Sequence, residues 1–241
     1  MPNLASAYAK TEPMMKPQKQ GTCALYSFWY ATLLLNQINP ARGEIAYPRI
    51  SLAPANFNGV STRNYLKHGL NFAPNSQGEV LSADEMTTIV ESFGYDCDTH
   101  LTGGTGREAF ITASLQADKP VAFAFLNNLN TGLPASGIGP NDPQRPACGP
   151  HWGLIYAEIG NDYRYLNPHY PSTPRTVLKS TVLASNACVD DIKYVRFWGK
   201  DPTTKGLIQI GDTAPATPPA TLYDIGPPTR QNLNNVLVAI Y

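Results

Sequence analysis

The chain has 241 residues, a length that suits one large domain with long loops. Its 18 basic and 18 acidic residues cancel, and no Lys- or Arg-rich run stands out, so the charge pattern of a nucleic-acid-binding protein is absent. The 22 prolines and 19 glycines, with only 15% charged residues, indicate ordered but irregular segments in place of long surface helices.

Cysteine usage and the N-terminus bear on the compartment. The four dispersed cysteines, at positions 23, 97, 148 and 188, are too few for a disulfide framework and indicate a reducing environment. No basic region followed by an apolar stretch opens the chain, and no window approaches ~20 apolar residues, so neither a signal peptide nor a membrane span is expected. These features predict a cytoplasmic protein, or one secreted without a cleavable signal peptide, such as an effector delivered to a target cell.

The first predicted helix covers residues 22–37. Residues 1–20 are polar and contain Pro13 and Pro17, so we expect them to be extended. Apolar side chains cover nearly all sides of the segment 22–37, which indicates a buried central helix. Residues 40–80 show no sustained period and contain several prolines, so they predict a loop-rich layer with one short helix around 60–68.

Two more helices and then a series of strands follow. Ser82 to Glu85 form a capping box for a helix that ends at Phe93 with Gly94 as its C-cap, and a further helix spans 105–117. Strands are predicted at 121–126, 151–159, 163–166, 194–198, 207–210 and 236–241, with a tight hairpin at 160–162. The long Gly- and Pro-rich segment 127–150 reads as a functional loop or lid, and the Pro-rich segment 213–229 as a strap.

This order of elements predicts an α+β fold. Helices come first and antiparallel strands second, so a central cysteine-bearing helix should pack on a C-terminal antiparallel sheet. We expect one domain over 1–241, with a helical part at about 20–118 and a sheet part at about 119–241.

Three residues in chain order suggest nucleophilic catalysis. Cys23 lies at the first turn of the apolar helix, where unpaired backbone N–H groups favour a thiolate and can hold an oxyanion. His151 begins one apolar strand and Asn167 ends the next, so a hairpin could place the Asn167 oxygen against the imidazole and orient it. Asp162 and His169 are weaker candidates for that orienting role.

Two non-catalytic interpretations of the same residues, a buried structural cysteine and a zinc site, compete with this one. Free cysteine is among the most buried residue types, so Cys23 could belong to the core of a non-catalytic binding module. The pairs Cys97-x-x-His100 and Cys148-x-x-His151 could instead supply four zinc ligands, which would remove His151 from catalysis. The Cys, His and Asn order favours the catalytic interpretation and implies no metal and no cofactor.

Taken together, three motifs resemble the papain-like cysteine peptidases, and more closely the compact bacterial branches (bacteriocin-leader peptidases and staphopain-like effectors) than the cathepsins. These motifs are a glutamine shortly before a helical cysteine, His151-Trp152-Gly153 opening a strand, and Asn167-Pro168 ending the next strand. The cathepsin signature after the cysteine is absent, since Ala24-Leu25 follow Cys23.

The resemblance implies a papain-like fold and a role for each matched residue. Cys23 would be the nucleophile, His151 the general base and acid, and Asn167 the orienting group. Gln18 or Gln20, together with the Cys23 N–H, would hold the oxyanion. The implied activity is that of a thiol protease, a hydrolase of peptide or isopeptide bonds with a protein or peptide substrate. The same triad also serves glutamine deamidases and transglutaminases, and the motifs do not separate these outcomes.

Overall fold

The protein is built around a six-stranded antiparallel sheet with the strand order β1-β8-β2-β3-β4-β5. The structure is a computed structural model that describes residues 3–18, 23–40, 80, 82–100, 105–138, 143–144, 148–189 and 233–241, and the backbone of 197–200 and 207–211. The strands of the sheet are β1 (Cys97–His100), β2 (Val121–Asn128), β3 (Cys148–Ile159), β4 (Asp162–Leu166), β5 (Arg175–Leu178) and β8 (Leu237–Ile240). A separate two-stranded sheet pairs β6 (Phe197–Lys200) with β7 (Leu207–Gly211).

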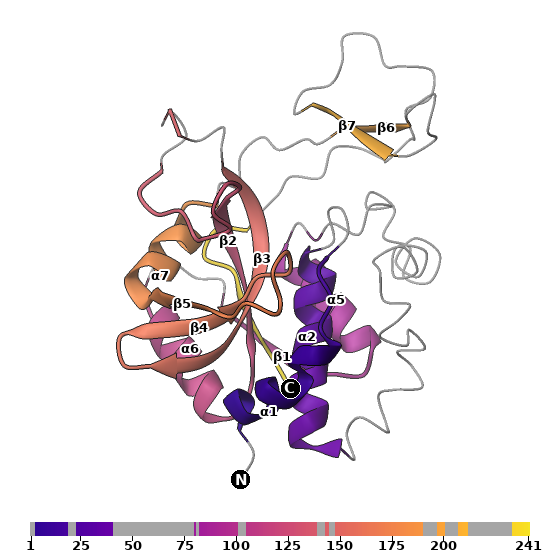
Figure 1. The fold of residues 1–241 in the computed structure, drawn as a ribbon, viewed down its shortest axis with the longest axis vertical. Coiled ribbons are helices and arrows are strands. Elements are labelled where there is room, and N and C mark those ends of the chain that lie inside the picture. Colours follow the sequence, from indigo (N-terminus) through magenta and orange to yellow (C-terminus); the bar gives the residue numbers. More distant parts are fainter. Residues whose placement is uncertain are drawn as a thin grey trace.

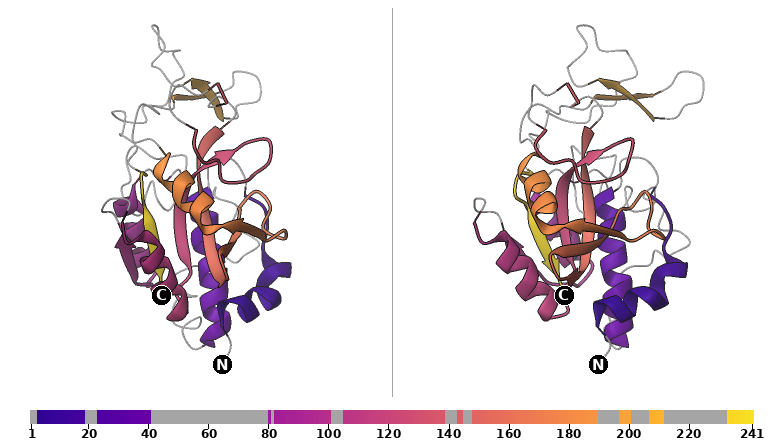
Figure 2. Two further views of the ribbon diagram at one scale, coloured as in Figure 1. Left: turned by 90° about the vertical axis from the view of Figure 1, so that its left-hand side faces the viewer. Right: turned by 60° about the vertical axis from the view of Figure 1, so that its left-hand side comes forward.

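Helices cover both faces of the main sheet (Figures 1 and 2). The helices are α1 (Leu4–Thr11), a 3-10 turn (Glu12–Met14), α2 (Cys23–Ile38), α5 (Ala83–Ser92), α6 (Arg107–Gln116) and α7 (Lys179–Ala187). One core cluster joins α1, α2 and α5 to one face, and a second joins α6 and α7 to the other. The molecule is therefore an α+β protein in which the sheet is the middle layer.

The central strand β2 shows how the sequence produces these layers. Ala122, Ala124 and Leu126 belong to the α2-side core, whereas Phe123 and Phe125 belong to the α6-side core. Side chains of a strand alternate between its two faces, so a strand that is apolar throughout needs a helix layer on each side. Every residue from Val121 to Asn127 is accordingly buried.

Local signals in the sequence are confirmed at several elements. The buried helix predicted at 22–37 is α2, and all of its residues from Ala24 to Leu35 are buried. Ser82 caps α5 by accepting a hydrogen bond from the Glu85 N–H (3.2 Å), and Gly94 ends the helix with φ = 81°. The β3–β4 hairpin turns at Gly160, which has φ = 58°.

Other expectations are wrong. Residues 4–11 form α1 where an extended chain was expected, because the Asn3 side chain caps the Ser6 N–H (2.9 Å) and Pro13 falls only after the helix has ended. Helix α6 begins at Arg107, two residues after the predicted start at 105, with Gly106 as its N-cap residue. Helices and strands are also not segregated along the chain: β1 lies within the supposed helical part, and α7 lies within the supposed sheet part.

Some expectations concern residues outside the described part of the chain. These are the short helix around 60–68, the strap at 213–229, and most of the strand predicted at 194–198.

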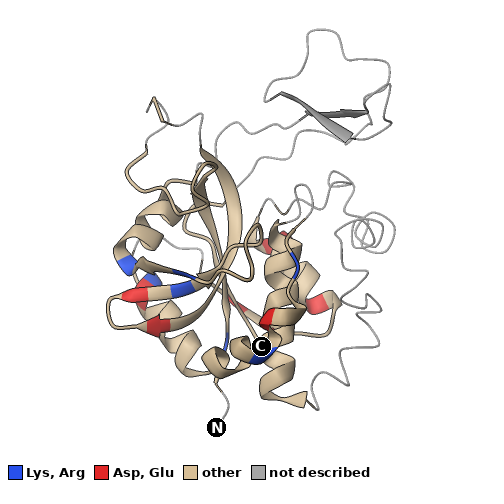
Figure 3. Cartoon of the chain, in the orientation of Figure 1, with Lys and Arg blue, Asp and Glu red and all other residues tan. Residues whose placement is uncertain are grey.

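Along the described elements, basic and acidic residues are interspersed (Figure 3). Within the same residues, no helix combines the length and the apolar character needed to cross a bilayer.

Candidate active site

His151 and Asn167 form a buried pair at the end of β4. The His151 Nε2 and Asn167 Oδ1 atoms lie 2.9 Å apart, and the two residues are 5% and 0% exposed. His151 lies on β3, and Asn167 follows Leu166, the last residue of β4. The β3–β4 hairpin thus joins two residues that are 16 positions apart in sequence, as their spacing predicted.

The hydrogen bonds of Asn167 determine the proton on His151. Its Nδ2 donates to the Gly132 carbonyl (2.8 Å), and its Oδ1 accepts the His169 backbone N–H (2.9 Å). Both contacts orient the amide with its oxygen toward His151, so Nε2 must carry the hydrogen that it donates. In the neutral ring the lone pair is then on Nδ1, which is the nitrogen that can accept a proton.

The loop after β2 supplies the carbonyl that orients Asn167. Asn128 folds this loop back on the strand: its Oδ1 accepts the N–H groups of residues 130 and 131, and its carbonyl accepts the Gly132 N–H (2.7 Å). The Gly132 carbonyl also accepts the Tyr165 hydroxyl (3.3 Å). Burial raises the pKa of Tyr165, which keeps that hydroxyl protonated as a donor.

Gly132 cannot readily be replaced at this position. It has φ = 70°, and a Cβ added to it would lie 2.8 Å from Cε2 of Tyr170 and 3.6 Å from Nδ2 of Asn167. The positive φ and the approach of the Tyr170 ring therefore favour glycine here, whereas the distance to Asn167 would be an ordinary van der Waals contact. The segment 127–150, expected to be a functional loop or lid, contains the support of the orienting residue.

Aromatic rings hold the His151 imidazole from two sides. Phe125, its partner on β2, meets it edge-on with centroids 5.4 Å apart, and the His169 ring stacks on it at 4.8 Å with 2° between the planes. Gly153 makes room for this packing, because a Cβ there would lie 2.8 Å from Phe123 and 3.1 Å from Phe125. The glycine of the His-Trp-Gly motif is thus explained by ring packing next to the imidazole.

Cys23 is the first residue of α2, is partly buried and is not part of a disulfide. The chain leading to it is held by two hydrogen bonds, from the Tyr30 hydroxyl to the Lys16 carbonyl (2.6 Å) and from the Gln18 N–H to the Pro168 carbonyl (2.7 Å). Pro168 directly follows Asn167. The approach to α2 therefore passes next to the residue that orients His151.

The edge of β3 is open at this point. The last residue of β4, Leu166, pairs with Leu154, so among the described strands β3 has no partner on that side from Cys148 to Gly153. His151 shares the sheet face of Phe125, whereas Cys23 packs against the α2-side core. The hydrogen bond from Gln18 to Pro168 brings the chain that precedes α2 next to Asn167.

The other candidates for the orienting role do not bond to the His151 ring nitrogen in the way that Asn167 does. Asp162 begins β4 and pairs with Ile159, at the opposite end of the hairpin from His151. His169 contacts His151 through its ring face, and only its backbone bonds to Asn167. Of the two glutamines, Gln18 is described and partly buried, and Gln20 lies outside the described residues.

The strand order excludes a zinc site formed by the two Cys-x-x-His pairs. Cys97 and His100 lie on β1, and Cys148 and His151 lie on β3, with β8 and β2 between them. Three strand spacings amount to about 14 Å, too far for four ligands of one ion. In the described part of the chain, no three His, Cys, Asp or Glu side chains come together in a way that could hold a metal ion.

Sequence reasoning missed the roles of Gly132 and of the His169 ring. The only local signal was the turn chemistry of Asn128 to Gly132, which marks a tight loop but not its contact with Asn167.

No protein-family model matches the chain, and no curated protein matches it.

Proposed function

We propose that the protein is a papain-like thiol hydrolase that cleaves peptide or isopeptide bonds through Cys23, His151 and Asn167. The observation that carries the proposal is the buried hydrogen bond between His151 Nε2 and Asn167 Oδ1, with the amide held by Gly132 and by the His169 N–H. This arrangement selects the tautomer in which Nδ1 takes up a proton, as a histidine that serves a thiol requires.

The position of Cys23 supports its role as the nucleophile. The N-terminus of a helix carries partial positive charge, which favours the thiolate over the thiol. Cys23 follows Gln18 by five residues, and Gln18 is bonded beside Asn167. We expect the thiol to meet Nδ1 of His151 at the open edge of β3, where each charge of the ion pair favours the other.

The proposed reaction has two stages. The Cys23 thiolate attacks the substrate carbonyl, and the oxyanion is held by the Cys23 N–H and a glutamine side chain, from Gln18 or Gln20. The His151 imidazolium gives its proton to the leaving amine as the C–N bond breaks, leaving a thioester on Cys23. The neutral imidazole then takes a proton from water, which attacks the thioester and releases the acid and the thiolate.

Alkylation of the native protein tests the nucleophile. Iodoacetamide labelling over a range of pH, measured by mass spectrometry at each cysteine, should modify Cys23 about two pH units below the ordinary thiol pKa of ~8.5. Cys97 is the internal control: it is also a partly exposed thiol, and burial, only partly offset by a hydrogen bond from Thr87, raises its pKa. In His151→Ala the early labelling of Cys23 should be lost.

Two outcomes would count against the proposal. If Cys23 is labelled only at the pH at which Cys97 reacts, or only after unfolding, the thiol belongs to the core and the protein is a binding module.

If the nucleophile is established, incubation with a denatured protein mixture, with Cys23→Ala as control, separates the possible activities. New chain termini indicate a protease, whereas conversion of glutamine to glutamate indicates a deamidase.

A further inference from the structure

His169 contacts both members of the buried pair. Its ring lies flat on the His151 imidazole, with centroids 4.8 Å apart and planes within 2°, and its backbone N–H donates to Asn167 Oδ1 at 2.9 Å. The Tyr170 N–H closes the same turn on the Asn167 carbonyl (2.8 Å). One residue therefore fixes the acceptor of the Nε2–H bond and covers the ring that donates it.

The surroundings of His169 favour its neutral form. Burial lowers the pKa of His169 below the ordinary value of 6.5. Among the described residues, its ring contacts are with His151 on β3 and with the neighbouring Tyr170 ring (6.1 Å), and Arg175 on β5 lies against that Tyr170 ring (5.6 Å) and not against His169 itself. A positive charge on His151, whose ring is in direct contact, would further disfavour a positive charge on His169.

We propose that His169 is a positioning residue, which as a neutral ring holds the His151 imidazolium in the plane that keeps Nε2–H on Asn167. The inference rests on the proposed function, since only a catalytic His151 needs a stable charged form. The face of a neutral aromatic ring attracts a cation, whereas two imidazolium rings in a stack repel each other. The effect is reciprocal: charge on His151 must disfavour charge on His169 to the same degree.

Nitrogen NMR of the imidazole side chains tests this coupling without any substrate. The chain has four histidines, so each signal can be assigned by substitution. Titration between about pH 4 and pH 9 should show the pKa of His151 lowered by about one unit in His169→Ala, and nearly unchanged in His169→Phe, which keeps a neutral ring. His100→Phe is the control, because His100 lies on β1 against Phe110.

A second measurement does not depend on the His169 variants folding. In His151→Phe, which keeps a ring in the stack but no charge, the pKa of His169 should rise, because the neighbouring positive charge is gone, while burial still holds it below the ordinary value. A third readout uses the His169 variants themselves: the alkylation rate of Cys23 near pH 6 should fall about tenfold in His169→Ala and stay within about twofold in His169→Phe.

The two proposals fail in different ways. If the pKa of His151 is equal in the wild type and in His169→Ala, or that of His169 is equal in the wild type and in His151→Phe, His169 only fills space and the inference is overturned. A Cys23 that stays inert while the two imidazoles remain coupled overturns the thiol hydrolase alone.

Discussion

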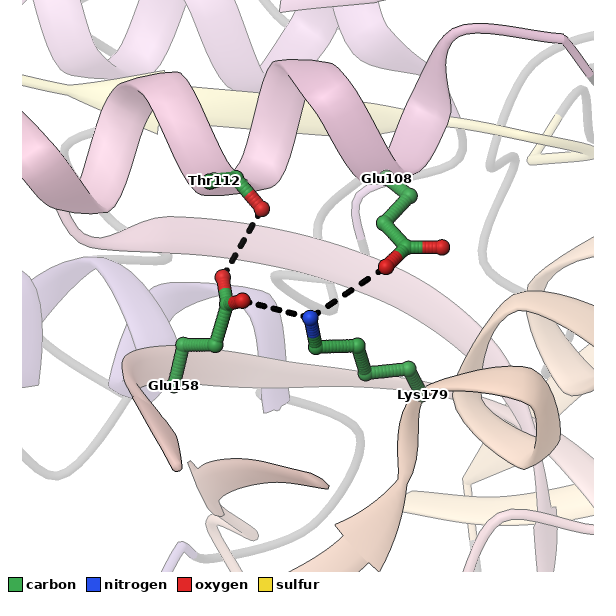
Figure 4. A network of polar contacts seen from close by, with 4 residues as sticks. All are labelled: Glu108, Thr112, Glu158 and Lys179. Carbon is green, nitrogen blue, oxygen red and sulfur yellow. Dashed lines mark hydrogen bonds and ion pairs between the residues drawn. The ribbon is translucent and has the colours of Figure 1, made fainter. Parts of the chain in front are cut away.

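Two polar clusters of this protein, one partly exposed and one buried, differ in how they end. In the first, Lys179 donates to Glu158 and to Glu108 (3.2 Å), and Thr112 donates to the second oxygen of Glu158 (2.8 Å; Figure 4). These residues join α6, β3 and the start of α7. Opposite charges meet within the cluster, so each one stabilises the ionised form of the other.

The second cluster consists of neutral groups joined to His151. Gly132, Asn167 and the His169 backbone form a directed set of bonds that ends at the Nε2–H of the imidazole. The basic atom of the ring is the other nitrogen, Nδ1. The comparison teaches that a network of polar side chains alone does not identify a site. A cluster of paired charges joins structural elements, whereas one that orients a titratable ring prepares it for proton transfer.

Removing His151, the proton acceptor, should have the largest effect on the rate of substrate cleavage. His151→Ala should lower the rate of substrate cleavage at least about 10³-fold, because no other group can take and return the proton. His100→Ala removes a partly buried imidazole outside the site and should leave the rate unchanged. Steady-state kinetics of both variants make the comparison. Equal rates in the two variants would show that His151 has no catalytic part.

Removing the orienting amide should damage both stability and activity. Asn167→Ala leaves the His169 N–H and the His151 Nε2–H without their partner in a buried site and removes one of the two donors to the Gly132 carbonyl, at a cost of about 2–4 kcal/mol. Chemical denaturation measures this cost, and alkylation of Cys23 measures the loss of the oriented imidazole. A variant as stable and as reactive as the wild type would contradict the hydrogen-bond set.

Gly132 offers a test in which the chain provides its own control. Gly132→Ala should cost about 1–3 kcal/mol, from its positive φ and from the approach of the new Cβ to Tyr170. Gly137 has a similar φ of 73° with nothing within 4 Å of an added Cβ, so Gly137→Ala carries the backbone strain alone. Tyr170→Ala should relieve the difference. Equal losses of stability for both glycines would exclude the steric contact as the reason.

The smallest effect should come from the charged cluster, and it should depend on pH. Burial raises the pKa of Glu158, but hydrogen bonds from Lys179 and Thr112 outweigh this and hold it below the ordinary value. The stabilisation is therefore present above the unfolded pKa of about 4.3 and is lost as pH falls through the lower folded pKa.

Thermal unfolding of Glu158→Gln should show this dependence. We expect a midpoint about 2–4 °C lower at pH 7, with the gap closing below about pH 4. Thr112→Val, which removes one donor to the same carboxylate, should show a smaller loss. Alkylation of Cys23 should be unaffected in both variants. A change in thiol reactivity would mean that the two clusters are coupled.

Predictions from the sequence succeeded where the signal was local. The helix at Cys23–Ile38, the Ser82 cap and the β3–β4 hairpin follow from apolar periodicity, capping residues and turn glycines. The His151–Asn167 contact was also within reach, because a hairpin register follows from its turn. Helix α7 was missed because its N-cap residue, Leu178, has no capping side chain.

The sequence by itself determined which residues could form the pair, since His151 and Asn167 lie on two strands joined by one tight turn. Only the tertiary structure decided which way the Asn167 amide faces, because its partner, the Gly132 carbonyl, is 35 residues away on another loop. It also decided that the approach to Cys23 runs beside Pro168. Both contacts join segments that are distant along the chain, and the packing of α2 and β2 against β3 brings them together.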